Sequence, residues 1–104
     1  MLQKIKTELL RSLNSSYDNI DIKIDDIEVS TLFDQKGDFT SNISMKLSKL
    51  LKTNPNQIAQ NIVDNFSLNF VDKIEIAGPG FLNIFVSDTS FKDFLNNQRV
   101  SLNN

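Results

Sequence analysis

The sequence contains no cysteine and no histidine among its 104 residues. Without cysteine there can be no disulfide framework, no thiolate metal site and no thiol nucleophile. Without histidine the chain lacks the side chain that most often serves as a general base or as a metal ligand. We therefore expect neither catalytic residues nor a metal or cofactor site in this chain.

The net charge and the hydropathy pattern exclude further classes of protein. The net charge is −2, so nucleic-acid binding cannot depend on a basic field over the whole domain. No apolar run approaches the length of a membrane span, and the N-terminus, MLQKIKTELL, is too polar for a signal peptide. With 39% hydrophobic and 23% charged residues, a chain of this length is expected to form one cytoplasmic globular domain without a membrane partner.

Hydrophobic periodicity predicts four helices. Apolar residues recur at helical spacing within residues 2–13, where residues 14–16 close the helix, and within 43–51 and 54–66, and a last short helix is expected at 88–95. Thr40 or Ser41 is expected to cap the second helix. The third begins with Asn-Pro, in which Asn serves as the N-cap and Pro occupies the first turn.

Alternating patterns predict the strands. The stretch IDIKIDDIEV, residues 20–29, is predicted as a strand interrupted by its acidic pair, and TLFDQKGDF, residues 31–39, as a loop or short strand. KIEIA and FLNIFV flank Gly78-Pro79-Gly80 and predict a hairpin. The Asn-rich end, residues 96–104, is expected to fray or to begin a linker.

This element order predicts the α+β class: a two-layer domain over residues 1–95, with a small antiparallel sheet and helices on one of its faces. One sheet face would then remain uncovered. The predicted core is Leu9, Leu47, Leu51, Ile58, Ile62, Phe66, Ile74, Ile84 and Val86.

The last predicted strand contains the candidate site. Successive side chains of a strand point to opposite faces, so the aliphatic residues within 81–86 can face the helices only if Phe81, Asn83 and Phe85 face away from them. Two aromatic rings and an amide would then stand together on the open face.

Three motifs carry a resemblance to a known family. GDFTSNISMKL (residues 37–47), Asn54-Pro55 and AGPGFLN (residues 77–83) occur in order and at compatible spacing. Together they resemble the N-terminal appended domain of arginyl-tRNA synthetases, over most of the chain. The resemblance implies that Phe81 and Asn83 contact a base in the D-loop of arginine-accepting tRNA. A family Tyr in place of Phe81 could add a hydrogen bond that Phe81 cannot make.

The chemistry of both residues fits that role. Unstacked RNA bases stack on aromatic rings, and the amide of Asn83 offers a donor and an acceptor that match the edge of adenine. The resemblance further implies that the parent protein is an ATP-dependent arginine–tRNA ligase and that its catalytic domain is a partner of this one. The His-containing ATP signature of such enzymes is absent here, so this segment is expected to be non-catalytic.

Two lysines are further candidates for nucleic-acid binding. KLSK, Lys46 to Lys49, resembles the Lys-Met-Ser-Lys-Ser loop of class I synthetases, but Leu47 lies on the apolar stripe of a predicted helix, so we interpret the match as accidental. Lys46 and Lys49 could approach phosphates, or they could simply form a solvated helix face. Gly37-Asp38 and Ser41-Asn42 are expected to shape the loop and to cap the helix, and their side chains could also support the neighbouring hairpin.

Two other classes of function stay open. The open sheet face could instead dock another protein or domain, with Phe81 and Phe85 as anchors. A small-ligand regulatory domain is disfavoured, because no converging charged groups are visible in the sequence.

Overall fold

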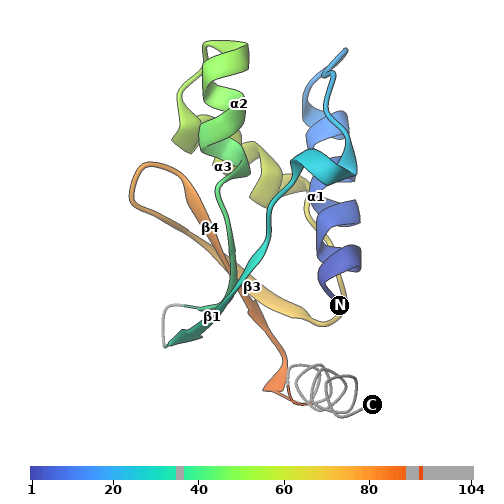
Figure 1. Ribbon diagram of the computed structural model, residues 1–104, viewed down its shortest axis with the longest axis vertical. Coiled ribbons are helices and arrows are strands. Elements are labelled where there is room, and N and C mark those ends of the chain that lie inside the picture. Colours follow the sequence, from blue (N-terminus) through green and yellow to red (C-terminus); the bar gives the residue numbers. More distant parts are fainter. Residues whose placement is uncertain (35–36, 89–91, 93–104) are drawn as a thin grey trace.

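A computed structural model describes residues 1–34, 37–88 and 92, and within them three α-helices lie over one face of a four-stranded antiparallel sheet (Figure 1). The strand order is β1-β2-β4-β3, which confirms the predicted α+β class with helices on one face. The elements are α1 (Leu2–Ser16), the 3₁₀ turn η1 (Ile24–Asp26), β1 (Ser30–Asp34), β2 (Gly37–Ser41), α2 (Ile43–Leu51), α3 (Pro55–Asn65), β3 (Val71–Ala77) and β4 (Phe81–Val86).

The helix layer is organised around α3, which packs against both α1 and α2. The start of α3 is formed as predicted: the side chain of Asn54 accepts a hydrogen bond from the backbone N of Asn56 at 2.8 Å, and Pro55 occupies the first turn. The cap of α2 differs from the prediction. Asn42 is its N-cap residue and makes no side-chain cap bond, while Thr40 lies in β2. The hydroxyl of Ser41 accepts a long hydrogen bond, 3.4 Å, from the backbone N of Ile43.

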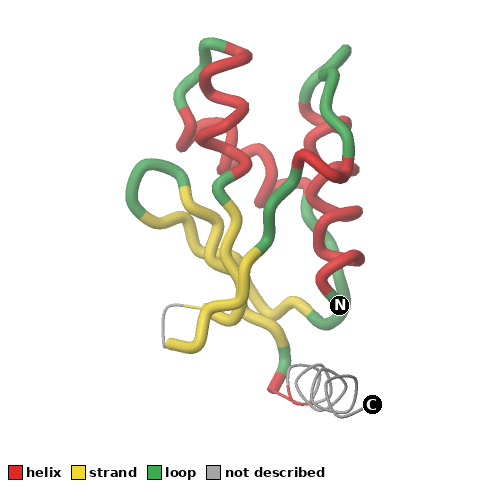
Figure 2. The backbone as a smooth tube through the Cα atoms, in the orientation of Figure 1, coloured by secondary structure: helices red, strands yellow, loops and turns green. Residues whose placement is uncertain are grey.

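The predicted strand at residues 20–29 is wrong. This segment is a loop that contains η1, and the backbone N of Lys23 donates to the carboxylate of Asp26 at 2.9 Å. The hydrogen bond from the backbone of Lys23 to the side chain of Asp26 thus closes a turn, whereas a strand would require an extended backbone at both residues. Alternate apolar residues still reach the core from this loop, with Ile27 completely buried. The hairpin of β1 and β2 forms instead in the following segment (Figure 2).

The core lies between the helices and the inner face of the sheet. Of the predicted core residues, Leu51, Phe66 and Ile74 are partly exposed but pack against the core. The others are buried as predicted: Leu9, Leu47, Ile58, Ile62, Ile84 and Val86.

The C-terminal predictions fall almost entirely outside the described residues. Of the expected helix at 88–95 only Asp88 and Lys92 are described, and the tail at 96–104 is not. Among the helices that are described, none has the length and apolar character needed to cross a membrane.

Candidate nucleic-acid interface

The outer face of the sheet is the candidate interface, because no described element covers it (Figure 1). Leu82, Ile84 and Val86 of β4 are buried against the helices, as the alternation predicts. The residues between them face outward. Phe81 is 39% exposed, which makes it one of only two large apolar side chains that are exposed in the described part of the chain.

Asn83 lies at the centre of a row of side chains that crosses three strands. Its register partner on β2 is Thr40, and its partner on β3 is Glu75. The hydroxyl of Thr40 donates a hydrogen bond to Oδ1 of Asn83 at 2.9 Å. The amide of Asn83 is therefore held at one of its two ends by a neighbouring strand.

Phe85 has a different environment from Phe81. Nζ of Lys73 lies 4.5 Å from the centroid of the Phe85 ring, a cation–π arrangement, and the same ammonium group pairs with Glu75 at 3.0 Å. One face of this ring is thus already occupied by a cation. Phe81 is consequently the ring that is better placed to stack on a base.

Asp38 and Gly37, both on β2, lie close to β4, the strand that carries Phe81, Asn83 and Phe85. The backbone N of Val86 donates to Oδ2 of Asp38 at 2.8 Å, which extends the contact between β2 and β4 beyond their last paired residues. Gly37 has a φ of +147°, and a Cβ at this position would lie 3.3 Å from Cβ of Asn83. The hydrogen bond to Asp38 confirms for this residue the expectation that its side chain supports the hairpin.

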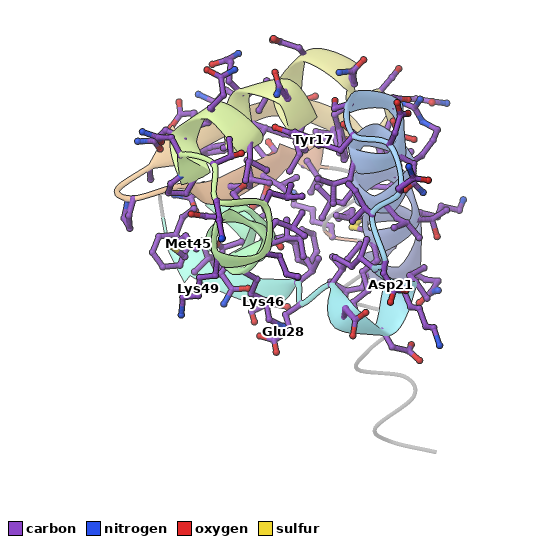
Figure 3. All side chains as sticks on the ribbon, turned by 90° about the horizontal axis from the view of Figure 1, so that it is seen from above. Tyr17, Asp21, Glu28, Met45, Lys46 and Lys49 are labelled. Atoms are coloured by element: carbon purple, nitrogen blue, oxygen red, sulfur yellow. The ribbon has the colours of Figure 1, made fainter. Side chains whose placement is uncertain are left out.

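The lysines predicted to approach phosphates lie elsewhere. Lys46 and Lys49 belong to α2, in the helix layer (Figure 3), whereas Phe81, Asn83 and Phe85 lie on β4. The helix confirms that KLSK is not a synthetase loop.

The two lysines differ in their surroundings. Nζ of Lys46 contacts the carbonyl oxygen of Asp26 at 3.2 Å and the carboxylate of Glu28 at 3.5 Å, whereas Lys49 makes no ion pair within the described residues. Both line a groove of about 490 Å³ between α2 and the loop before β1. Its apolar lining includes Leu50, which is 74% exposed.

Sequence reasoning missed the contribution of Thr40 to the site. Thr40 was predicted as a helix cap, but the alternation of the segment GDFTS, with Phe39 buried between outward-facing neighbours, is the period-two signal of a strand. A register that places Thr40 beside Asn83 cannot be derived from the sequence. Within the described residues no three acidic side chains converge as they would around a metal ion.

Comparison with solved structures supports the fold. The arginyl-tRNA synthetase of Plasmodium falciparum superposes with a TM-score of 0.71 at 22% identity, covering 85% of this chain and 16% of that protein. For the arginyl-tRNA synthetase of Thermus thermophilus the TM-score is 0.69 at 22% identity, with coverage of 86% and 15%.

Sequence relatives identify the family. An arginine–tRNA ligase of Staphylococcus aureus is 37% identical over 93 residues, 85% of this chain but 17% of the relative. One from Shewanella piezotolerans is 47% identical over 60 residues, 57% of this chain and 10% of the relative. The chain thus spans less than a fifth of these curated relatives. Because the profile described as "Arginyl tRNA synthetase N terminal domain" matches residues 3–86, the chain belongs to that family.

Proposed function

We propose that this chain is the non-catalytic tRNA-binding domain of an arginine–tRNA ligase and that its outer sheet face contacts the D-loop of arginine-accepting tRNA. Family membership and the name shared by the relatives support the assignment. Since the chain spans only 17% of the Staphylococcus relative, the ATP-dependent ligase activity of the parent, its cytoplasmic location and the catalytic domain as a partner are parts of the same proposal.

The observation that carries the proposal is an exposed aromatic ring beside a fixed amide on an uncovered sheet face. Phe81 and Asn83 are two residues apart on β4, so their side chains emerge on the same side. RNA is recognised specifically at loop bases that are unstacked, stacked on aromatic rings and hydrogen-bonded through their edges. In this arrangement Phe81 supplies affinity and Asn83 supplies discrimination.

The charged residues have a secondary role in the proposal. Lys73 carries the positive charge nearest to Phe85 and can contact the backbone of the bound loop, although its pairing with Glu75 reduces its net attraction for phosphate. Lys46 and Lys49, on the helix layer, would meet phosphates of a different part of the tRNA. Lys49 is the better candidate because it has no competing carboxylate partner within the described residues.

The test uses the full-length ligase and measures kcat/KM for tRNA. Phe81→Ala should weaken tRNA recognition by about 1–3 kcal/mol, the value of a stacked base. Asn83→Ala should lose discrimination between cognate tRNA and a tRNA altered at one D-loop position. Leu50→Ala is the matched control, because it removes an exposed apolar side chain from the other layer.

The thermal unfolding midpoint of all three variants should equal that of the wild type, since none of the three replaced side chains belongs to the core. If Asn83→Ala still discriminates D-loop variants as wild type does, the base-reading role is wrong. Loss of activity in Phe81→Ala that is equal for every tRNA would then favour the alternative, in which this face docks another domain.

A further inference from the structure

We propose that Thr40 is a positioning residue that orients the amide of Asn83, so that Asn83 reads the RNA base as a hydrogen-bond donor. This inference rests on the proposed function and adds to it the chemical class of base atom that is recognised. It replaces the sequence-based expectation that the amide presents both a donor and an acceptor.

The hydrogen bond between the two side chains fixes which end of the amide is free. Oγ1 of Thr40 donates to Oδ1 of Asn83 at 2.9 Å, and both residues lie in directly paired positions of β2 and β4. The carbonyl end of the amide is thereby engaged within the sheet. The Nδ2 amino group makes no hydrogen bond within the described residues, so it is the end available to a ligand.

The neighbour on the opposite side favours the same orientation. Glu75 pairs with Asn83 across β3 and β4, and an ionised carboxylate only accepts hydrogen bonds. If the amide were reversed, its carbonyl oxygen would turn toward the strand that carries this carboxylate, and two acceptors would face each other. The row from Thr40 to Glu75 therefore favours an amide with its N–H₂ group away from Thr40.

The backbone around Asn83 limits its freedom to reorient. β4 is an interior strand, bonded to β2 on one side and to β3 on the other. An amide held in this way needs little further ordering when it binds a base, so it discriminates between bases instead of adapting to several of them.

The consequence is a rule for the base that is read. A donor that faces the loop selects a base presenting an acceptor at that point, either a ring nitrogen or a carbonyl oxygen. A base that presents an amino group there would place two donors against each other and leave both without a partner. Such mispairing of a fixed polar group is costly and yields strong discrimination.

The first test removes the orienting hydroxyl from the full-length ligase. Thr40→Val keeps the shape and the strand preference of the residue but cannot donate, whereas Thr40→Ser keeps the hydroxyl. Discrimination between cognate and D-loop-altered tRNA, measured as the ratio of kcat/KM values, should fall at least tenfold in Thr40→Val and should persist in Thr40→Ser. Ser30→Ala is the control, because Ser30 is the exposed partner of Thr40 on β1.

The second test exchanges the donor for an acceptor. Asn83→Asp preserves the side-chain shape and can still accept the hydrogen bond of Thr40. Relative to Asn83→Ala, it should shift preference away from the cognate base and toward a base with an amino group at the same point. The new charge repels the phosphates of every tRNA alike, so this effect cancels when the kcat/KM values of two tRNAs are compared within one variant.

A third measurement does not depend on RNA. In the free 104-residue chain, the side-chain amide of Asn83 should show a high NMR order parameter that falls in Thr40→Val and is kept in Thr40→Ser. Unchanged order in Thr40→Val, or full tRNA discrimination in that variant while Asn83→Ala loses it, would overturn the role of Thr40 and leave the proposed function intact. If Asn83→Ala itself discriminates as wild type does, the proposed function and this reading of the base both fail.

Discussion

Gly80, in the turn between β3 and β4, lies directly against Pro55, the first residue of α3: a Cβ on Gly80 would stand 3.1 Å from Cβ of Pro55. Its φ of +128° is also a backbone conformation that residues with a side chain rarely adopt. This contact fixes the turn to the helix layer, and with it the end of β4 that carries Phe81.

Gly80→Ala should therefore destabilise the domain by about 2–4 kcal/mol, from backbone strain and from the clash with Pro55 together. Gly78→Ala is the matched comparison in the same turn. Gly78 has a φ of +55°, and the nearest atom to its Cβ position is 3.8 Å away, so its substitution should cost only about 1–2 kcal/mol. Urea unfolding of both variants measures the difference, and equal losses would show that the Pro55 contact is unimportant.

Ile62→Asp should unfold the domain. Ile62 is completely buried in α3, and an unpaired charge there costs several kcal/mol, roughly half or more of the stability of a small domain. Leu50→Asp, which places the same charge at a 74% exposed position of α2, should retain the wild-type thermal transition. A cooperative transition of Ile62→Asp at the wild-type temperature would show that the core is placed wrongly.

Glu8 should make the stability of the domain depend on pH. Its carboxylate accepts hydrogen bonds from the guanidinium of Arg11, at 2.9 and 2.5 Å, and from the backbone N of Ser67 at 2.8 Å, which joins α1 to the segment after α3. The bond from Arg11 is the main reason that the pKa of Glu8 is lowered. Partial burial opposes this effect, and the Ser67 N–H adds to it.

Because the folded-state pKa of Glu8 lies below its ordinary value of about 4.3, its contribution is complete above that value and is lost as the pH falls through the folded-state pKa. Glu8→Gln should be less stable than wild type by about 1–2 kcal/mol at pH 7. The difference should shrink in acid. Denaturant midpoints measured from pH 7 down to pH 2 test this, and a difference that stays constant with pH would contradict it.

The chain should form neither arginyl-adenylate nor charged tRNA when mixed with ATP, arginine and arginine-accepting tRNA. It has no histidine for the ATP signature of class I synthetases, and it corresponds to only 17% of the Staphylococcus ligase. A full-length ligase serves as the positive control in the same pyrophosphate-exchange and charging assays. Turnover by the chain above a no-protein control would overturn the non-catalytic role.

The sequence alone determined the first three helices, the last hairpin and most of the core. These features depend on local signals: the 3.6-residue apolar stripes, the Asn54-Pro55 start and the two-residue alternation of β4. The same alternation assigned Phe81, Asn83 and Phe85 to the face away from the helices, and the structure confirms that placement.

Residues 20–29 show where such local signals fail. An alternating pattern records only which side chains are buried, and a loop across α1 can bury Ile27 as well as a strand can. Strand formation also needs a partner with free backbone groups, and here the carboxylate of Asp26 bonds to the backbone of Lys23 instead.

Contacts between distant segments were decided by the tertiary structure alone. The pairing of β2 with β4 brings Thr40 to Asn83, 43 residues later, where the hydroxyl of Thr40 donates to Oδ1 of the amide. The placement of Lys46 and Lys49 in the helix layer likewise follows from packing α2 over the face of the sheet opposite to the one that carries Phe81, Asn83 and Phe85 (Figure 1). Strand register and the sheet face on which each helix packs depend on packing energies summed over the whole core. They therefore cannot be predicted from any short stretch of sequence.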